Sequence, residues 1–172
     1  MRDDQRLERL NSLDANEAAS EFLKCCGSKT WAQKMVAGRP FMNLNELLAS
    51  ADQIWWSLNP RDWLEAFHSH PKIGERKAAA PTSTQSREWS EAEQAAVNTA
   101  APETLQTLSD LNRQYQEKFG YIFIVCATGK GSDEMLAILR RRLGNNPDEE
   151  LGNAAAEQAK ITQLRLKKLI DS

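Results

Sequence analysis

Hydrophobic residues recur every three or four positions along most of the chain, which is the spacing of one face of an α-helix. Residues 102–119 show this most clearly, with Leu105, Leu108, Leu111 and Tyr115 on one face. Other stretches repeat the pattern, and residues that commonly start or end helices separate them. The pattern therefore predicts an all-α protein of about eight helices.

Several of these stretches begin with a residue whose side chain accepts hydrogen bonds from free backbone N–H groups. Asp14 and Asn43 each precede a glutamate by three residues, as in a capping box. Asn59 and Asn146 each precede a proline, which favours the first helical position. The predicted helices begin at Asp14, Ser28, Asn43, Asn59, Ser90, Pro102, Ser132 and Asn146. The last is the longest and extends to about Leu169.

Two segments lack helical periodicity. Residues 75–89 mix alanine, proline, serine, threonine and charge, which predicts a surface loop. Tyr121–Ala127 is rich in β-branched and aromatic residues, but no second strand is available to pair with it. We therefore expect a buried extended connection between helices. No repeat or linker divides the chain, so we expect a single domain over residues 1–172.

The composition is typical of a soluble globular protein, with 41% hydrophobic and 27% charged residues. The net charge is −2, and acidic and basic residues are interspersed. Such a chain lacks the basic surface expected for nucleic acid or an anionic membrane, and its apolar runs are too short to cross a bilayer. We expect neither kind of partner. The sequence leaves open whether the protein forms a homodimer.

The termini and the cysteines predict a reduced, cytoplasmic protein. The first ten residues are too charged for a secretory signal peptide, and the last residues are not a peroxisomal signal. Three cysteines, an odd number, argue against a disulfide framework, and Cys25 and Cys26 are too close for an unstrained mutual bridge. The sequence indicates no role for this cysteine pair.

Both histidines of the chain lie in one short stretch, at positions 68 and 70. His70 continues the apolar stripe of Trp63 and Phe67 and stands where Pro71 ends the helix. Burial there favours the neutral ring and the helix dipole favours the charged ring, so His70 is a candidate proton-transfer group near neutral pH. Alternatively, His70 only packs and caps the helix. His68 falls on another face, and we interpret it as structural or exposed.

The two histidines are not accompanied by a cluster of further ligands, so no metal site is predicted. Ser90 and Glu93 have the spacing of a capping box, and with Gln94 they also offer a polar binding surface at the expected helix start. Arg165 shares the apolar stripe of the last helix. It either binds an anionic ligand or extends its charged end to water.

Four segments together resemble one family. They are "DWLEAFHSHPKIGE", "WSEAEQ", "LNRQYQEKFGYIFIVCATG" and "EQAKITQLRLKKL". In this order they are similar to the OHCU decarboxylases of uric acid breakdown, where OHCU is 2-oxo-4-hydroxy-4-carboxy-5-ureidoimidazoline. The resemblance extends from about Asn16 to Leu169.

The resemblance implies an all-helical enzyme that decarboxylates OHCU, a small ureide, to (S)-allantoin without a cofactor. It implies that His70, Glu93 and Arg165 are the catalytic residues. The substrate-binding residues that it implies are Pro71, Ser90, Glu93, Gln94, Ile124, Val125, Cys126, Ala127 and Arg165.

Two alternatives remain open at this point. One is a helical interaction module without catalytic activity, which would use Trp55, Trp56 or Trp89 as exposed anchors. The other is an enzyme that acts on a related ureide such as 5-hydroxyisourate.

Overall fold

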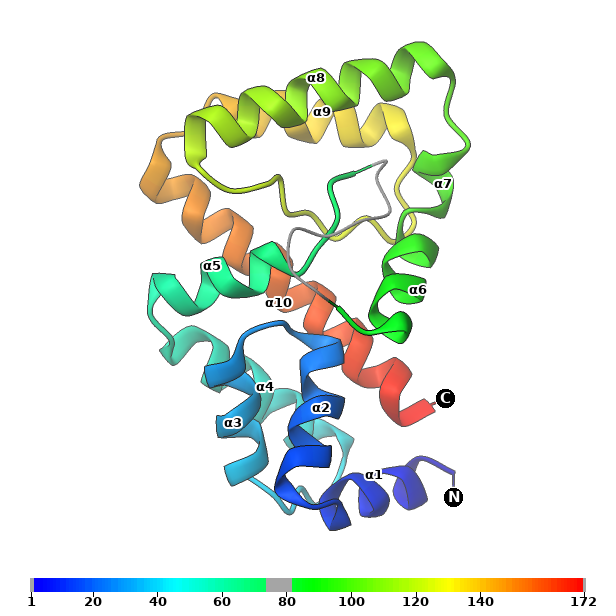
Figure 1. The fold of residues 1–172 in the computed structure, drawn as a ribbon, viewed down its shortest axis with the longest axis vertical. Coiled ribbons are helices and arrows are strands. Elements are labelled where there is room, and N and C mark those ends of the chain that lie inside the picture. Colours follow the sequence, from blue (N-terminus) through cyan, green and yellow to red (C-terminus); the bar gives the residue numbers. More distant parts are fainter. Residues whose placement is uncertain (1, 74–81, 172) are drawn as a thin grey trace. The chain divides into compact units, whose positions relative to one another are not determined.

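The computed structural model describes residues 2–73 and 82–171 of the 172. These residues form ten helices and no β-strand (Figure 1). The helices are α1 (Arg2–Ser12), α2 (Ala15–Cys25), α3 (Lys29–Ala37), α4 (Leu44–Ser57), α5 (Pro60–His68), α6 (Thr84–Glu93), α7 (Ala95–Asn98), α8 (Pro102–Phe119), α9 (Ser132–Leu143) and α10 (Pro147–Asp171). The all-α prediction is confirmed, with α1 and α7 in addition to the eight predicted helices.

Most predicted helix starts are confirmed by their capping hydrogen bonds. The side chain of Asp14 accepts from the N–H of Glu17 at 2.8 Å, and that of Asn43 accepts from the N–H of Glu46 at 2.9 Å. At the start of α9, the N-cap is Gly131 rather than the predicted Ser132. These contacts span a few residues, which is why sequence alone locates them.

The predicted helix start at Ser90 is wrong. Helix α6 begins at Thr84, because the Ser83 hydroxyl accepts from the N–H of Ser86 at 3.1 Å. Ser90 lies inside α6, where its hydroxyl donates to the Ser86 carbonyl at 3.0 Å, a usual bond for a serine within a helix. Residues 84–89 are therefore helical and not part of a loop. Residues 75–81 of the predicted loop lie outside the described residues.

Contacts divide the chain into two compact units, with boundaries inside α5 and α10. The first unit comprises residues 1–66 and 159–172, in which α2 packs on α3 and α3 packs on α4. Trp31 is at its core: the side chain is fully buried, its ring contacts Phe22 edge-on, and its indole N–H donates to the Ala51 carbonyl at 3.1 Å.

The tryptophans proposed as exposed anchors are mostly not exposed. Trp55 is buried against Trp63, with ring centroids 5.9 Å apart, and Trp89 is half-buried. Only Trp56 of the three is substantially exposed. A single exposed ring gives little support to an interaction module built on these residues.

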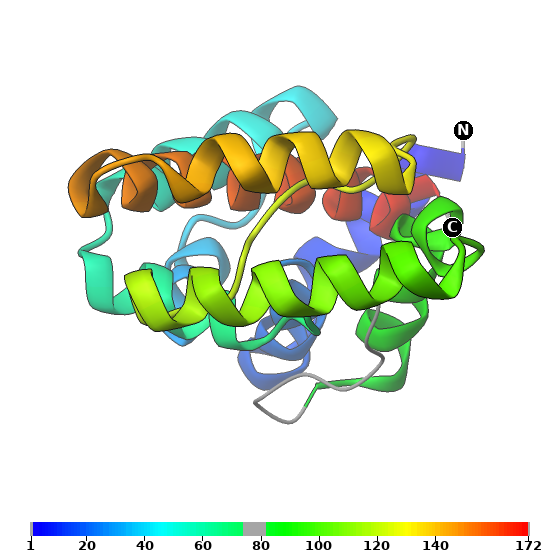
Figure 2. The ribbon, with the colours of Figure 1, turned by 90° about the horizontal axis from the view of Figure 1, so that it is seen from above.

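The second unit comprises residues 67–158. Helix α8 is capped by Gly120, whose φ of 84° is the left-handed conformation that glycine adopts readily. The chain then returns as an extended segment, so that α9 runs beside α8 and in the same direction (Figures 1 and 2). All residues of the segment Tyr121–Ala127 are buried, which confirms the predicted buried extended connection.

Candidate functional site

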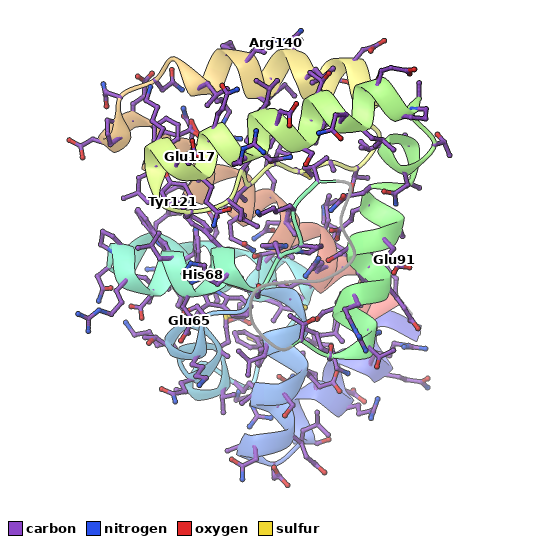
Figure 3. The ribbon with its side chains drawn as sticks, turned by 45° about the horizontal axis from the view of Figure 1, so that its top comes forward. Glu65, His68, Glu91, Glu117, Tyr121 and Arg140 are labelled. Carbon is purple, nitrogen blue, oxygen red and sulfur yellow. The ribbon has the colours of Figure 1, made fainter. Side chains whose placement is uncertain are left out.

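His70 lies two residues beyond the end of α5 and is 8% exposed. Its backbone N–H donates to the Phe67 carbonyl at 3.2 Å, which continues the last turn of the helix. The ring atom Nε2 lies 2.6 Å from the side-chain oxygen Oε1 of Gln158, a residue of α10 with no exposed surface. The predicted burial of His70 is confirmed. His68, labelled on α5 in Figure 3, is exposed, as one of the two interpretations expected.

The residues beside His70 pack on the extended segment. Phe67 is fully buried, and its ring centroid lies 5.3 Å from that of Tyr121, the first residue of the segment. Pro71, which follows His70, is also buried. A contact between two buried aromatic rings thus lies three residues before the histidine.

The end of α6 contributes the second group of candidate residues. Glu93 is the last residue of α6 and is half-buried, while Ser90 and Gln94 are buried. Glu91, labelled on the same helix in Figure 3, is exposed. Because Glu93 stands at the C-terminal end of α6, its interpretation as part of a capping box is wrong.

The extended segment is held by side chains that bind its backbone. Arg142 of α9 donates from Nη1 to the Ile124 carbonyl at 2.5 Å. The N–H of Cys126 donates to Glu157 Oε1 at 3.3 Å, and the Cys126 carbonyl accepts from Lys130 Nζ at 2.7 Å. Glu157 precedes Gln158 on α10, so adjacent residues of one helix contact the segment and His70.

Consecutive residues of an extended chain point their backbone N–H and C=O groups to opposite edges. Residues 124 and 126 face the edge that binds Arg142, Glu157 and Lys130, so the backbone groups of residues 125 and 127 face the opposite edge. Within residues 2–73 and 82–171, the N–H groups of Val125 and Ala127 make no hydrogen bond. Buried backbone groups are normally bonded. These two N–H groups are therefore candidates for binding a ligand.

Arg142 also belongs to a buried ion pair. Its Nε lies 2.9 and 3.0 Å from the two carboxylate oxygens of Glu150, which has no exposed surface. The guanidinium stacks 4.6 Å from the ring centroid of Phe123, and the Tyr115 hydroxyl donates to Glu150. Burial, together with this bond to a carboxylate, raises the pKa of Tyr115 well above its usual range.

Arg165 lies on α10 in the unit formed by residues 1–66 and 159–172. It is 3% exposed, and its Nη1 donates to the Lys24 carbonyl at 3.3 Å. The interpretation in which Arg165 extends to water is therefore wrong. Cys25 and Cys26, both free and buried, lie in the same unit, and burial raises the pKa of Cys26 to about 12.

Sequence reasoning missed Gln158, Glu157 and the pair formed by Arg142 and Glu150. Gln158 had a detectable signal, because it is a polar residue three positions from both Ala155 and Ile161 on an apolar stripe. In the part of the chain that the structure describes, no cluster of three potential metal ligands occurs. None of its helices is long and apolar enough to cross a membrane.

Comparison with known families finds a match to the model of the OHCU decarboxylase family over residues 11–167. The chain is 41% identical over 150 residues to the uric acid degradation bifunctional protein TTL of Arabidopsis thaliana. The match covers 87% of this chain and 46% of that protein, so the chain spans about half of that relative. It is 33% identical over 171 residues to the 2-oxo-4-hydroxy-4-carboxy-5-ureidoimidazoline decarboxylase of Amia calva, covering 95% of this chain and 94% of that protein.

Two solved structures have similar folds. A crystal structure of OHCU decarboxylase in the presence of (S)-allantoin matches with a TM-score of 0.76 and 38% identity, over 89% of this chain and 99% of that one. A crystal structure of (S)-allantoin synthase matches with a TM-score of 0.69 over 96% of this chain and 54% of that one. At 20% identity, this second match shows the fold alone.

Proposed function

The chain belongs to the OHCU decarboxylase family, and from this premise we propose that it converts OHCU to (S)-allantoin with His70 as the proton-transfer residue. This makes it a carboxy-lyase of uric acid degradation. The observation that carries the assignment of His70 is its buried ring, held at Nε2 by Gln158 beside the extended segment. General acid–base groups require such a fixed position.

The substrate supplies its own electron sink. When the bond between the ring carbon and the carboxylate breaks, CO₂ leaves and the electron pair enters the adjacent C=N system. A proton then adds to the neighbouring ring carbon, which bears the ureido group, and the hydroxyl oxygen loses its proton to become a carbonyl oxygen of allantoin. The protein has to position the substrate and to manage protons, and no cofactor is needed for this chemistry. We assign to His70 the removal of the hydroxyl proton as CO₂ leaves or the delivery of a proton to the ring carbon that bears the ureido group.

The polar groups of a ureide match the candidate binding residues. Glu93 and Gln94 would accept hydrogen bonds from ureido and ring N–H groups, with Ser90 and Pro71 lining the site. The substrate-binding role of residues 124–127 is supported by the N–H groups of Val125 and Ala127, which would donate to substrate carbonyl oxygens.

Arg165 is proposed to bind an anionic or carbonyl oxygen of the substrate. This role is supported by the resemblance of the sequence around Arg165 to the family and by the burial of its guanidinium. Charge-assisted hydrogen bonds of this kind are strong where water is excluded.

The proposed activity is tested by generating OHCU in situ from urate and following allantoin by circular dichroism. We expect the protein to accelerate formation of the (S) enantiomer, whereas spontaneous decay yields no enantiomeric excess. A protein that only consumes 5-hydroxyisourate would leave the chirality of allantoin unchanged. This result, or no effect of the protein on either step, would contradict the proposal.

Replacing Glu93 by glutamine is expected to lower kcat/KM about 10- to 100-fold, because a hydrogen bond to a charged group contributes about 1.5–3 kcal/mol. The free energy of unfolding should change by less than about 0.5 kcal/mol, since a carboxylate at the C-terminal end of α6 does not stabilise the helix dipole. Steady-state kinetics and urea denaturation measure the two effects. Glu91→Gln, at an exposed position of the same helix, is the control and should leave both unchanged. Equal activity of the two variants would exclude Glu93 from the site.

A further inference from the structure

The hydrogen bond between His70 and Gln158 connects two buried side chains and is 2.6 Å long. The atom of Gln158 that faces the ring is Oε1, which accepts hydrogen bonds and cannot donate them. Nε2 of His70 must therefore carry a hydrogen. A neutral imidazole carries a hydrogen on only one of its two nitrogens, so in the neutral ring Nδ1 has the lone pair that accepts a proton.

We propose that Gln158 is a positioning residue that holds His70 in the tautomer with hydrogen on Nε2, so that Nδ1 exchanges the proton with the substrate. This inference rests on the proposed function, which makes His70 the proton-transfer residue. The Nε2 hydrogen stays bonded to Gln158 throughout. Nδ1 takes up the hydroxyl proton as CO₂ leaves, or delivers a proton to the ring carbon that bears the ureido group.

An amide oxygen suits this task better than a carboxylate would. A carboxylate beside the ring would stabilise the imidazolium form, whereas the amide orients the ring without a net charge. The support is also rigid: Gln158 lies within the 25-residue helix α10, and the residue before it, Glu157, bonds the backbone of Cys126. One turn of α10 thus fixes His70 and the extended segment together.

The tautomer is directly measurable by NMR of protein with ¹⁵N-labelled histidine rings. The chain has two histidines, so the spectrum of His68→Ala assigns both rings. At a pH where the rings are neutral, we expect His70 in a single form with hydrogen on Nε2, and exposed His68 in exchange between both forms. A wild-type spectrum with the His70 hydrogen on Nδ1 would overturn the proposal without any Gln158 variant.

Steady-state kinetics test whether the tautomer of His70 affects catalysis. Methionine has nearly the shape of glutamine but offers no oxygen acceptor, so Gln158→Met should lower kcat about 10- to 100-fold, as when histidine-orienting partners are removed from metal sites. KM should stay within about twofold. Gln158→Glu keeps an oxygen acceptor at this position, so it should keep the Nε2–H form and a kcat above that of Gln158→Met, but below that of the wild type because the carboxylate stabilises the imidazolium form.

Gln163→Met is the matched control on the same helix. Gln163 is half-buried and donates a hydrogen bond to the Leu48 carbonyl at 2.9 Å, so its loss measures the structural cost of removing a side-chain amide bond from α10. We expect Gln163→Met to affect the urea midpoint but not kcat. If Gln158→Met loses stability to the same extent and keeps its kcat and its tautomer, Gln158 is only structural.

Different results would contradict the role of His70 and the role of Gln158. High activity of folded His70→Ala would overturn the proposed role of His70. An inactive His70→Ala together with a fully active Gln158→Met would overturn only the inference about Gln158.

Discussion

Replacing His70 by asparagine or alanine is expected to lower kcat by about 10²–10⁴-fold, the usual contribution of a general acid–base group. The fold should persist, because the hydrophobic contacts around His70 are made by neighbours such as Phe67 and not by the imidazole. The chirality assay gives the rate, and far-ultraviolet circular dichroism confirms folding.

His68→Ala is the matched control, two residues away on the exposed side of α5. It should keep the wild-type rate within about twofold. Near-normal turnover of a folded His70→Ala protein would contradict the assignment. Equal losses in both variants would show that the end of α5 has been disturbed as a whole.

Replacing Glu150 by glutamine is expected to reduce the free energy of unfolding by about 3–5 kcal/mol, the usual cost of breaking a buried ion pair from one side. The change leaves the charge of Arg142 buried and without its carboxylate, at 5% exposure. It also weakens the acceptor of the Tyr115 hydroxyl. Urea denaturation followed by circular dichroism measures the loss.

A double variant measures how much of this stability loss comes from the unpaired charge of Arg142. Arg142→Met combined with Glu150→Gln should recover part of the loss, because no unpaired charge then remains. Arg141→Met, at an exposed neighbouring position of α9, should change stability by less than about 0.5 kcal/mol. A loss below about 1 kcal/mol for Glu150→Gln would mean that water reaches the Arg142 guanidinium.

Local interactions explain which parts of the fold were predictable. The caps at Asp14 and Asn43 depend on contacts three residues apart, and both helix starts were confirmed. Ser90 shows the limit of such reasoning. It has the spacing of a capping box with Glu93, but Ser83 caps the helix about two turns earlier. Both serines fit the local rule, and the sequence does not show which one begins the helix.

The candidate site was predictable only in part. The burial of His70 followed from its helical phase with Phe67 and from the proline after it. Its partner Gln158 is 88 positions away in the sequence, and Arg142 binds a carbonyl 18 positions away. Such contacts depend on how the chain folds back on itself, so periodicity and caps do not reveal them.

The extended segment has a consequence for how this protein can diverge. Arg142 and Glu157 bind the segment through the carbonyl of Ile124 and the N–H of Cys126, atoms that every residue type except proline provides. Side chains of similar volume can therefore replace one another here during evolution at modest cost. Inserting or deleting one residue would exchange the two edges of the chain, turning the bound backbone atoms away from their partners. The length of this segment, more than its amino-acid identity, is what natural selection has to preserve.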